Sequence, residues 1–385
     1  MKKCIYCREM KKESEFTIEH VMPQFLGGAY CPDDFKNRDV CAKCNSNLGL
    51  FVDAAFEKNF LVYSYLNENA YSFFDPTRPV GLPIRCMGPC DLVPPHMTDE
   101  EVCEFWLGPL GEQIFWIRPK DDRLYWYVGG NPRTTKTART IAYFLWSERS
   151  IKNPLLTWLT FRDAFEGRRV KKVMCTTVEG SDPTDIGFSE PDSTDRDRIT
   201  YFLACCSKGE VRKIQQSMYT KFDGRFFAKT SIGIAYSLFG EKALSTNYAA
   251  ELYKGLWYRE GDPMPSVRGT SPLSAETDST FAKLMGESNG VTFIIQRIQD
   301  QIGLNLSIGT TLNWTVQCAS CDNLTADDLA RIGDGMVIIL YKPLQRGLTL
   351  TLPQYMAHKC GAHINAEIVE INAKANKHID YFKNL

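Results

Sequence analysis

Two short cysteine pairs near the beginning of the chain constrain its fold more than any other feature of the sequence. Cys4 and Cys7 form one Cys-x-x-Cys pair, and Cys41 and Cys44 form a second, with thirty-three residues between the pairs. Each pair can direct two sulfurs toward one point, so that four thiolates together can surround a Zn²⁺ ion tetrahedrally. A segment this short buries little apolar surface. The pattern therefore predicts a small, loop-rich module whose folding depends on a structural zinc ion.

The rest of the chain is longer than one hydrophobic core usually supports. Its 385 residues, of which 44% are hydrophobic, predict a folded protein of two or three domains. Fourteen cysteines in a chain without a secretory leader are more typical of metal sites and reduced core thiols than of a disulfide scaffold. Reduced, buried thiols are the alternative interpretation of the two pairs. We expect no membrane span and a cytoplasmic protein, because no run of eighteen apolar residues occurs.

Periodicity and turn-forming residues divide the chain into three predicted regions. Residues 1–60 form the zinc module, residues 61–180 form a strand meander with helices and a basic surface, and residues 181–385 form a mixed domain. The acidic stretch 182–197, interrupted by Pro and Gly, marks the second boundary. The predicted fold class is thus α+β, with a small N-terminal module followed by a larger mixed region.

Individual elements are predicted from local patterns of apolar residues. A helix beginning near Asn45 and continuing to Tyr63 closes the module, because its apolar residues recur at intervals of three and four. The other predicted helices are 137–147, 155–165, 210–219, 229–238, 247–258 and 353–382. The predicted strands are 104–107, 113–118, 124–128, 168–173, 198–205, 291–297, 304–308, 311–317 and 336–341.

The N-terminal segment contains further polar motifs in a fixed order around the second cysteine pair. Glu19 and His20 precede a proline and a glycine pair, Asn37 stands before the second cysteine pair, and Asn45 directly follows it. The order C-x-x-C, acid-His-x-x-Pro, Gly-Gly, Asn and C-x-x-C-Asn resembles HNH endonucleases with the ββα-metal fold. The resemblance covers about 15% of the chain. It implies that the protein hydrolyses phosphodiester bonds in DNA, with RNA as the alternative substrate.

The resemblance implies a role for each polar residue of the motif. His20 is the expected base for the attacking water, a role that suits an imidazole near neutral pH. Glu19 and Asn45 are the expected ligands of a catalytic Mg²⁺ or Mn²⁺ ion, which prefers oxygen donors. Asn37 is expected to fix the loop and orient the histidine. Glu19 and His20 are adjacent, so a bend in the strand is needed for both to serve one centre.

Several positions in the motif leave alternatives open. The final position is Asn45 and not histidine, which fits the carboxylate-plus-amide version of the family, and Asn47 is a rival ligand. The alternative role of Asn45 is a helix cap. The alternative role of His20 is structural or zinc-binding. Asp53, two helical turns after Asn45, is either an acid of the site or a solvated helix residue.

Charge is distributed unevenly along the chain, although the net charge is only −1. Residues 118–172 hold thirteen Lys or Arg against five acids, and residues 179–197 hold seven acids against one Arg. This predicts a basic face beside an acidic loop, with an ordinary uneven surface as the alternative. Trp106, Trp116 and Trp126 could stack bases, but a sheet core is the preferred interpretation. The predicted phosphate contacts are Arg133, Lys136, Arg139, Arg168, Arg169, Lys171 and Lys172.

The resemblance also suggests, by analogy, a restriction-type or anti-phage defence effector. The region behind the module would then supply recognition, control or binding of a protein partner or small ligand. A homodimer is expected if both DNA strands are cut. The alternatives are a zinc-ribbon protein that binds nucleic acid without cleaving it, and a nuclease subunit that is silent until a partner or ligand acts on it.

Overall fold

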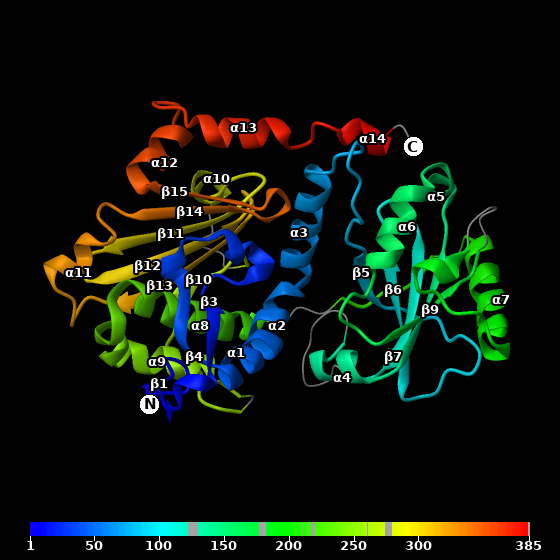
Figure 1. Cartoon of the computed structure of the whole chain (residues 1–385), viewed down its shortest axis with the longest axis horizontal. Coiled ribbons are helices and arrows are strands. Elements are labelled where there is room, and N and C mark those ends of the chain that lie inside the picture. Colours follow the sequence, from blue (N-terminus) through cyan, green and yellow to red (C-terminus); the bar gives the residue numbers. More distant parts are fainter. Residues whose placement is uncertain are drawn as a thin grey trace. The chain divides into compact units, whose positions relative to one another are not determined.

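A computed structural model of the chain describes residues 1–121, 130–176, 182–209, 211–216, 220–259, 261–273 and 279–383. The fold is mixed α+β, as the sequence predicts, and the chain forms two compact units (Figure 1). Unit 1 consists of Met1–Glu57 and Thr220–Ala375, and unit 2 consists of Lys58–Tyr219 and Asn376–Leu385. Within the described ranges, no helix has both the length and the apolar character needed to cross a membrane.

This division differs from the predicted boundaries 1–60, 61–180 and 181–385. The N-terminal residues share a unit with residues 220–375, and the acidic stretch 182–197 lies inside unit 2. The chain changes unit at Glu57 and again at Thr220. Local composition marks exposed turns, whereas a compact unit is defined by packing between segments that are remote in sequence. The acidic stretch therefore did not reveal the boundary.

Unit 1 contains a six-stranded antiparallel sheet with the strand order β10-β13-β12-β11-β14-β15. Its central strands are apolar on both faces, as the buried run Phe293, Ile294 and Ile295 shows, so both faces must be covered. The predicted strands of this region are confirmed. The strands are β10 (Gly269–Thr270), β11 (Val291–Ile298), β12 (Gln301–Ile308), β13 (Leu312–Ser320), β14 (Met336–Tyr341) and β15 (Arg346–Thr351).

Helices of unit 1 pack against this sheet (Figure 1). Helices α8 (Thr220–Phe239) and α9 (Asn247–Leu256) contact β13, which confirms the two predicted helices at 229–238 and 247–258. The predicted single helix 353–382 is wrong, because Gly361 has φ 75° and ends the first helical segment. The remaining helices are α10 (Ser279–Met285), α11 (Ala326–Ala330), α12 (Leu352–Lys359), α13 (Ala366–Lys374) and, in unit 2, α14 (Ile379–Lys383).

The N-terminal segment of unit 1 is a pair of short hairpins followed by helix. Its elements are β1 (Lys2–Lys3), β2 (Met10–Lys11), β3 (Phe16–His20), β4 (Lys36–Cys41), α1 (Ala42–Leu48), a π-helical turn (Gly49–Asp53) and α2 (Ala54–Glu57). The predicted continuous helix from Asn45 to Tyr63 is interrupted, because the side chain of Asn59 accepts a hydrogen bond from Leu61 N and starts a new helix, α3 (Phe60–Ser72), in unit 2.

The N-terminal segment shares its core with α8. The rings of Phe56 and Phe226 stack with centroids 3.9 Å apart. A Cβ on Gly233 would lie 2.7 Å from the side chain of Val21, so glycine at this position lets α8 approach the segment closely. The hydroxyl of Tyr253 on α9 donates to the carbonyl of Ile5 at 2.7 Å. The segment is therefore part of one core with residues 220–375.

Unit 2 is built on a five-stranded mixed sheet with the order β5-β6-β7-β8-β9, in which β8 and β9 are parallel. Trp116 of β7 packs on one face near Phe161 of α6, while Phe115 packs on the other face near Phe202 of α7. Both faces are thus covered by helices. The elements are β5 (Arg85–Pro89), β6 (Glu101–Leu107), β7 (Gln113–Pro119), α4 (Pro132–Thr137), β8 (Thr140–Leu145), α5 (Glu148–Lys152), α6 (Pro154–Asp163), β9 (Val170–Met174) and α7 (Ser193–Ser207).

Predictions in unit 2 were confirmed in part. Strands 104–107, 113–118 and 168–173 and helix 155–165 are present as β6, β7, β9 and α6. The predicted helix 137–147 is strand β8, which is buried on both faces and so shows no alternation.

Two further elements of unit 2 differ from the sequence prediction, and a third predicted element falls on residues that the structure does not describe. The predicted strand 198–205 is helix α7, which begins with a capping box between Asp192 and Asp195. The described residues 211–216 are not helical, contrary to the predicted helix 210–219. The predicted strand 124–128, with Trp126, lies outside the described residues.

Candidate active site and metal centre

The four N-terminal cysteines converge on one point. Their Sγ atoms all lie within 4.8 Å of one another. The first pair lies in the turn between β1 and β2, and the second pair spans the start of α1, where the N–H of Cys41 donates to Sγ of Cys4 at 3.4 Å. Four thiolates at this spacing fit the tetrahedral coordination of Zn²⁺. In the described part of the chain, no other group of three or more His, Cys, Asp or Glu side chains meets the geometry of a metal site.

His20 lies at the end of β3 with its ring half-buried. Its Nδ1 is 3.3 Å from the carbonyl oxygen of Gly28. A carbonyl can only accept a hydrogen bond, so this contact requires the proton on Nδ1 and leaves the lone pair of the neutral ring on Nε2. The ring is therefore held in the tautomer that a general base needs.

The two asparagines of the motif fix the backbone beside Glu19. The β3–β4 register shifts between Thr17 and Glu19, and Oδ1 of Asn37 accepts from the N–H of Asp39 at 2.6 Å within the shifted part of β4. Nδ2 of Asn45 donates to Oγ1 of Thr17 at 3.0 Å and to the carbonyl of Ile18 at 2.8 Å. Asn37 thus orders the bulge, and Asn45 fastens α1 to the strand one residue before Glu19.

The structure also bears on the alternatives for the helix. The N-cap of α1 is Cys41, so Asn45 is not a helix cap. Asn47 is exposed on α1, whereas Asn45 contacts β3. The expected bend between Glu19 and His20 is absent. The register shift, with its extra residue in β4, lies before Glu19, and Glu19 and His20 pair regularly with Asn37 and Lys36, so their side chains face opposite sides of β3.

Glu19 is directed into the interior of unit 1, where it meets a lysine from α8. Oε1 of Glu19 is 2.7 Å from Nζ of Lys229, and Oδ2 of Asp53 is 2.6 Å from the same Nζ. Lys229 is 1% exposed and Glu19 is 3% exposed. The hydroxyl of Tyr6 lies 3.5 Å from Oε1 of Glu19 as a long hydrogen bond. Two carboxylates therefore share one buried ammonium, an arrangement we call the Lys229 cluster (Tyr6, Glu19, Asp53 and Lys229).

A comparison with known families matches this segment. Residues 4–61 match a family described as HNH endonuclease. The N-terminal segment is an HNH endonuclease module. The matched range begins at Cys4, the first residue of the cysteine cluster, and includes every polar residue of the motif described above. No curated protein and no solved structure shows significant similarity to the chain.

Burial shifts the pKa values of the charged groups in the Lys229 cluster, which adjoins His20 in the sequence through Glu19. Removal from water raises the pKa of Glu19 and of Asp53, although the neighbouring Lys229 counteracts this effect. Burial alone would lower the pKa of Lys229, but the attraction of Asp53 and Glu19 outweighs it and the pKa is raised. Lys229 therefore stays charged. Oδ1 of Asp53 is buried without a hydrogen-bond partner among the described residues.

Lys229 was not identified from the sequence. One sequence signal could have revealed it. Lys229 is the one Lys or Arg in the mostly apolar stretch 226–239 of α8. A lysine is almost never fully buried unless it is paired. Asp53, for which a solvated role was the alternative, is its second partner.

Replacing Cys41 by serine is expected to remove the metal from the HNH module and to unfold its two hairpins. Zinc supplies a large share of the folding free energy in modules of this size, about 10–16 kcal/mol in zinc-finger peptides. Metal content per chain and limited proteolysis of residues 1–57 measure the effect. Cys360→Ser, at an exposed cysteine of the same unit, is the control and should keep its metal. Full metal content in Cys41→Ser would contradict the assignment.

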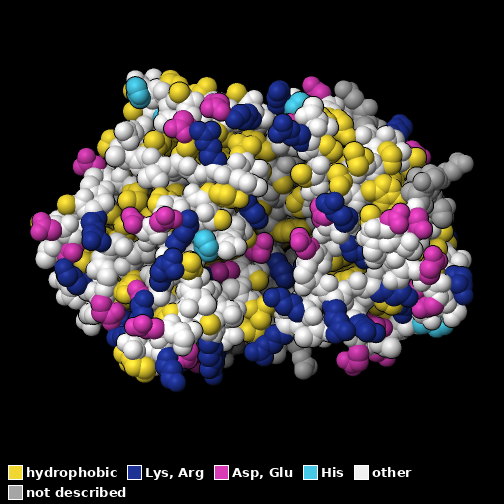
Figure 2. Space-filling view, viewed as in Figure 1, with side chains coloured by type: hydrophobic (Ala, Val, Ile, Leu, Met, Phe, Trp, Pro, Cys, Tyr) yellow, Lys and Arg dark blue, Asp and Glu magenta, His cyan; other side chains and the backbone are white. Residues whose placement is uncertain are grey.

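The predicted phosphate contacts differ in how accessible their charges are. Lys136 and Arg139, at and just beyond the end of α4, are exposed, and Figure 2 shows Lys and Arg side chains gathered on the face where α4 lies. Lys171 pairs with Asp192 and Asp195. All seven residues belong to unit 2: Arg133, Lys136, Arg139, Arg168, Arg169, Lys171 and Lys172.

Two further predicted contact residues, Lys172 and Arg168, are also engaged within unit 2. Lys172 donates to the carbonyls of Phe161 and Arg162, and burial lowers its pKa to about 8. The guanidinium of Arg168 lies over the rings of Trp106 and Trp116. Both tryptophans are buried in the sheet core, in agreement with the preferred interpretation of these residues.

Proposed function

We propose that this protein is a metal-dependent endonuclease that hydrolyses phosphodiester bonds in DNA through its HNH module. The observation that carries the proposal is the contact between Nδ1 of His20 and the carbonyl of Gly28, which leaves Nε2 able to accept a proton. Nε2 takes a proton from a water molecule, whose oxygen then bonds to phosphorus. The bond from phosphorus to the 3′ oxygen breaks and that oxygen takes a proton from solvent water, which leaves a 5′-phosphate and a 3′-hydroxyl.

Glu19 and Asn45 are the residues that would hold the catalytic Mg²⁺ or Mn²⁺ ion. A carboxylate and an amide oxygen are donors of the kind these ions prefer. The amide nitrogen of Asn45 is bonded to β3, so its Oδ1 is the atom suited to a cation. Oε1 of Glu19 is paired with Lys229, so Glu19 would have to exchange this contact to reach the ion. When bound, the ion would stabilise the charge that develops on the leaving oxygen. The four cysteines would hold the structural zinc.

The rest of the chain is proposed to bind and select the substrate. Exposed basic residues around α4 and Arg169 would contact phosphates of the nucleic acid. The proposed setting remains a cytoplasmic restriction-type or anti-phage effector, in which a partner, a small ligand or a second copy of the chain controls cleavage.

Cleavage of supercoiled plasmid by the purified chain tests this proposal. Mg²⁺ and Mn²⁺ are expected to support conversion to nicked or linear DNA, and the products should carry 5′-phosphates that a ligase can seal. A structured RNA in a parallel reaction distinguishes the two substrates. Zinc-loaded protein that binds plasmid but leaves it intact with every ion would favour the binding-protein alternative, unless cleavage appears when a partner or ligand is added.

Gly28→Ala is expected to slow cleavage by about 100-fold, because it displaces the carbonyl that orients His20. A Cβ at Gly28 would lie 1.6 Å from the carbonyl oxygen of Met22, so the turn must move. Cleavage rate and thermal unfolding are measured together. Gly49→Ala is the matched control, because a Cβ there meets no atom within 4 Å. Equal rates for the two variants would show that the turn does not orient the histidine.

A further inference from the structure

Unit 2 contains a pocket that the proposed cleavage chemistry does not use. Its volume is about 360 Å³, which lies within the range of small-ligand sites. Tyr63, Trp106 and Phe165 provide aromatic side chains in its lining, and Asp163 and Glu166 provide carboxylates. The pocket thus combines flat apolar surfaces with a few polar groups.

Arg168 supplies the cationic group of this pocket. Its guanidinium carbon lies 5.3 Å from the ring centre of Trp106, 5.0 Å from that of Trp116 and 5.7 Å from that of Phe165. Its Nη1 is buried and has no hydrogen-bond partner among the described residues. A buried donor without an acceptor is unfavourable. A rotation of the guanidinium toward an acceptor atom of a ligand in the pocket would relieve this cost.

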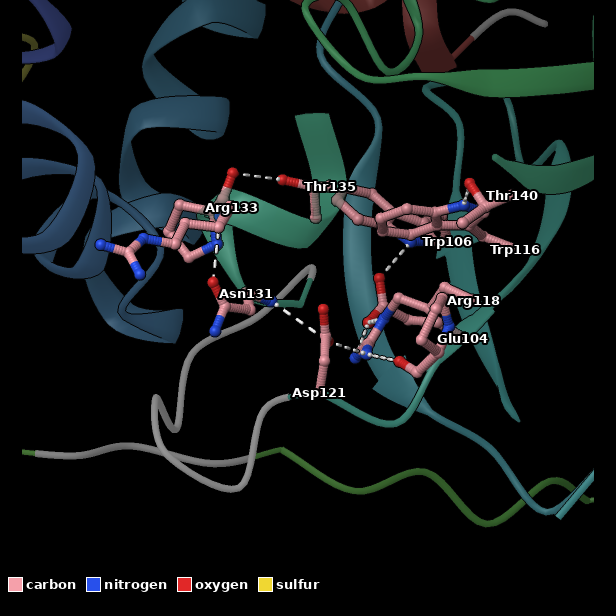
Figure 3. Close-up of polar contacts among 11 residues, drawn as sticks. Glu104, Trp106, Trp116, Arg118, Asp121, Asn131, Arg133, Thr135 and Thr140 are labelled. Carbon is pink, nitrogen blue, oxygen red and sulfur yellow. Dashed lines mark hydrogen bonds and ion pairs between the residues drawn. The ribbon is translucent and has the colours of Figure 1, made fainter. Parts of the chain in front are cut away.

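A chain of hydrogen bonds fixes the aromatic wall of the pocket (Figure 3). Nε1 of Trp106 donates to Oε1 of Glu104 at 2.7 Å, and Arg118 donates to Oε2 of the same carboxylate from Nε at 2.8 Å and from Nη2 at 2.7 Å. Glu104 and Arg118 are both almost fully buried. A fully paired buried ion pair of this kind holds its partners in one arrangement. Trp106 is therefore a preorganised surface.

The same chain of contacts continues to α4. Nη1 of Arg118 donates to Oδ1 of Asp121 at 3.3 Å, and the N–H of Asn131 donates to the same oxygen at 3.3 Å. The side chain of Asn131 then caps α4 by accepting from the N–H of Arg133 at 3.0 Å. Figure 3 shows the guanidinium of Arg133 directed away from this chain. The pocket wall and a basic helix are thus joined through contiguous contacts.

A second connection places basic residues next to Arg168. The N–H of Arg169 donates to the carbonyl of Thr135 at 3.2 Å, and its Nη1 donates to the carbonyl of Thr137 at 3.4 Å. Arg169 and Lys136 are exposed. Cations that follow a nucleic-acid backbone, beside aromatic rings that can stack a base, are typical of sites for single strands and unpaired nucleotides.

We propose that this pocket binds a nucleobase, with the attached phosphates held by Lys136 and Arg169. A base offers a flat face to the partly exposed ring of Tyr63 and an edge to Trp106, whose ring is nearly perpendicular to that of Tyr63. It also offers acceptor atoms to Arg168 and amino groups to Asp163 or Glu166. The proposal extends the proposed function, because the nucleic acid that the HNH module cuts is the one that unit 2 would recognise. The base belongs either to a nucleic-acid strand or to a free nucleotide, which share this chemistry.

Fluorescence anisotropy with two DNA hairpins tests the proposal without requiring cleavage. The hairpins are identical except that one carries an unpaired base where the other carries an abasic site, and no divalent cation is added. The full-length protein is expected to bind the base-bearing hairpin about tenfold more tightly. Arg168→Ala should reduce this ratio to about 1, and Arg168→Lys should give an intermediate value because it keeps the charge and loses the planar group.

Two controls separate base recognition from general attraction. Arg196→Ala changes an exposed arginine of α7 in the same unit and should keep the tenfold ratio. Lys136→Ala should weaken binding of both hairpins equally and reduce the salt slope by about 1. Thermal unfolding confirms that each variant is folded. Titration with AMP, CMP, GMP and TMP identifies the source of the base, since binding of a mononucleotide as tight as that of the hairpin would indicate a free nucleotide.

The outcomes for this pocket and for the nuclease are distinguishable. Equal affinity for the two hairpins together with no binding of any mononucleotide would overturn the pocket assignment, as would a ratio that folded Arg168→Ala retains. Base-dependent binding by a protein that never cleaves would support the pocket and reject the nuclease. Cleavage by a protein that binds both hairpins equally and binds no mononucleotide would support the nuclease and reject the pocket.

Discussion

His20→Ala is expected to abolish cleavage of plasmid DNA while the protein stays folded and keeps its zinc. Removing a general base costs a factor of about 10²–10⁴ in rate. The ring of His20 is half-buried and contacts a carbonyl of the Gly27–Gly28 turn, whereas the four residues of the candidate zinc site are cysteines. Rates of plasmid nicking at saturating Mg²⁺ or Mn²⁺, with zinc content and thermal unfolding on the same samples, measure the effect.

His363→Ala is the control for this experiment, because His363 is an exposed histidine of the same unit. It should cleave at the rate of the unaltered protein. A fully active His20→Ala protein would remove the base assignment. Loss of zinc together with loss of activity would instead indicate the structural or zinc-binding role.

Lys229→Met is expected to destabilise unit 1 strongly, because it breaks a buried ion pair. It leaves the buried carboxyl groups of Glu19 and Asp53 without their shared ammonium. Removing one partner of a buried ion pair costs about 3–5 kcal/mol. Unfolding in urea measures the effect, and we expect the free energy of unfolding to fall by an amount in this range.

The pH dependence of this loss has a definite sign. Burial raises the pKa of Glu19 and of Asp53 above their unfolded values near 4, and without Lys229 both would rise further. The folded variant then binds more protons than its unfolded chain, so its stability falls as pH rises through and above this range. The difference from the unaltered protein should be smallest at acidic pH. A loss that is independent of pH would indicate packing alone.

Two companion variants complete the test. The triple change Lys229→Met, Glu19→Gln and Asp53→Asn removes the charges together and should recover much of the stability. Lys242→Met breaks the ion pair with Asp328, in which the lysine side chain is 53% exposed, and should cost less than about 1 kcal/mol. Equal losses in the free energy of unfolding for Lys229→Met and Lys242→Met would contradict this account. They would show that the carboxylates left without Lys229 do not destabilise the protein.

The sequence was most informative where function depends on short, fixed spacings. The two cysteine pairs predicted the thiolate centre, and the motif around Glu19 and His20 predicted the HNH module, because ligands and their supporting turns are set by local geometry. The apolar strands between 291 and 341 were also predicted correctly. Their β-branched residues and bounding turns form a local signal.

The sequence was least informative where burial depends on distant partners. Lys229 lies 176 residues from Asp53, and only packing of α8 against the HNH module brings them together. Strand β8 was predicted as a helix because both of its faces are covered, one by α6 and the other by α7. Register, pairing and unit membership all depend on such long-range contacts, which a single sequence does not display.

The chain path through unit 1 has an evolutionary consequence. Unit 1 is interrupted after α2 and resumes with α8, so residues 58–219 are inserted, in the topological sense, between its two segments. Insertions tolerate replacement because the host needs only compatible ends at the two junctions. An exchange of unit 2 would therefore have to replace residues 58–219 together with residues 376–385, while α8, which supplies Lys229, would be inherited with the first 57 residues.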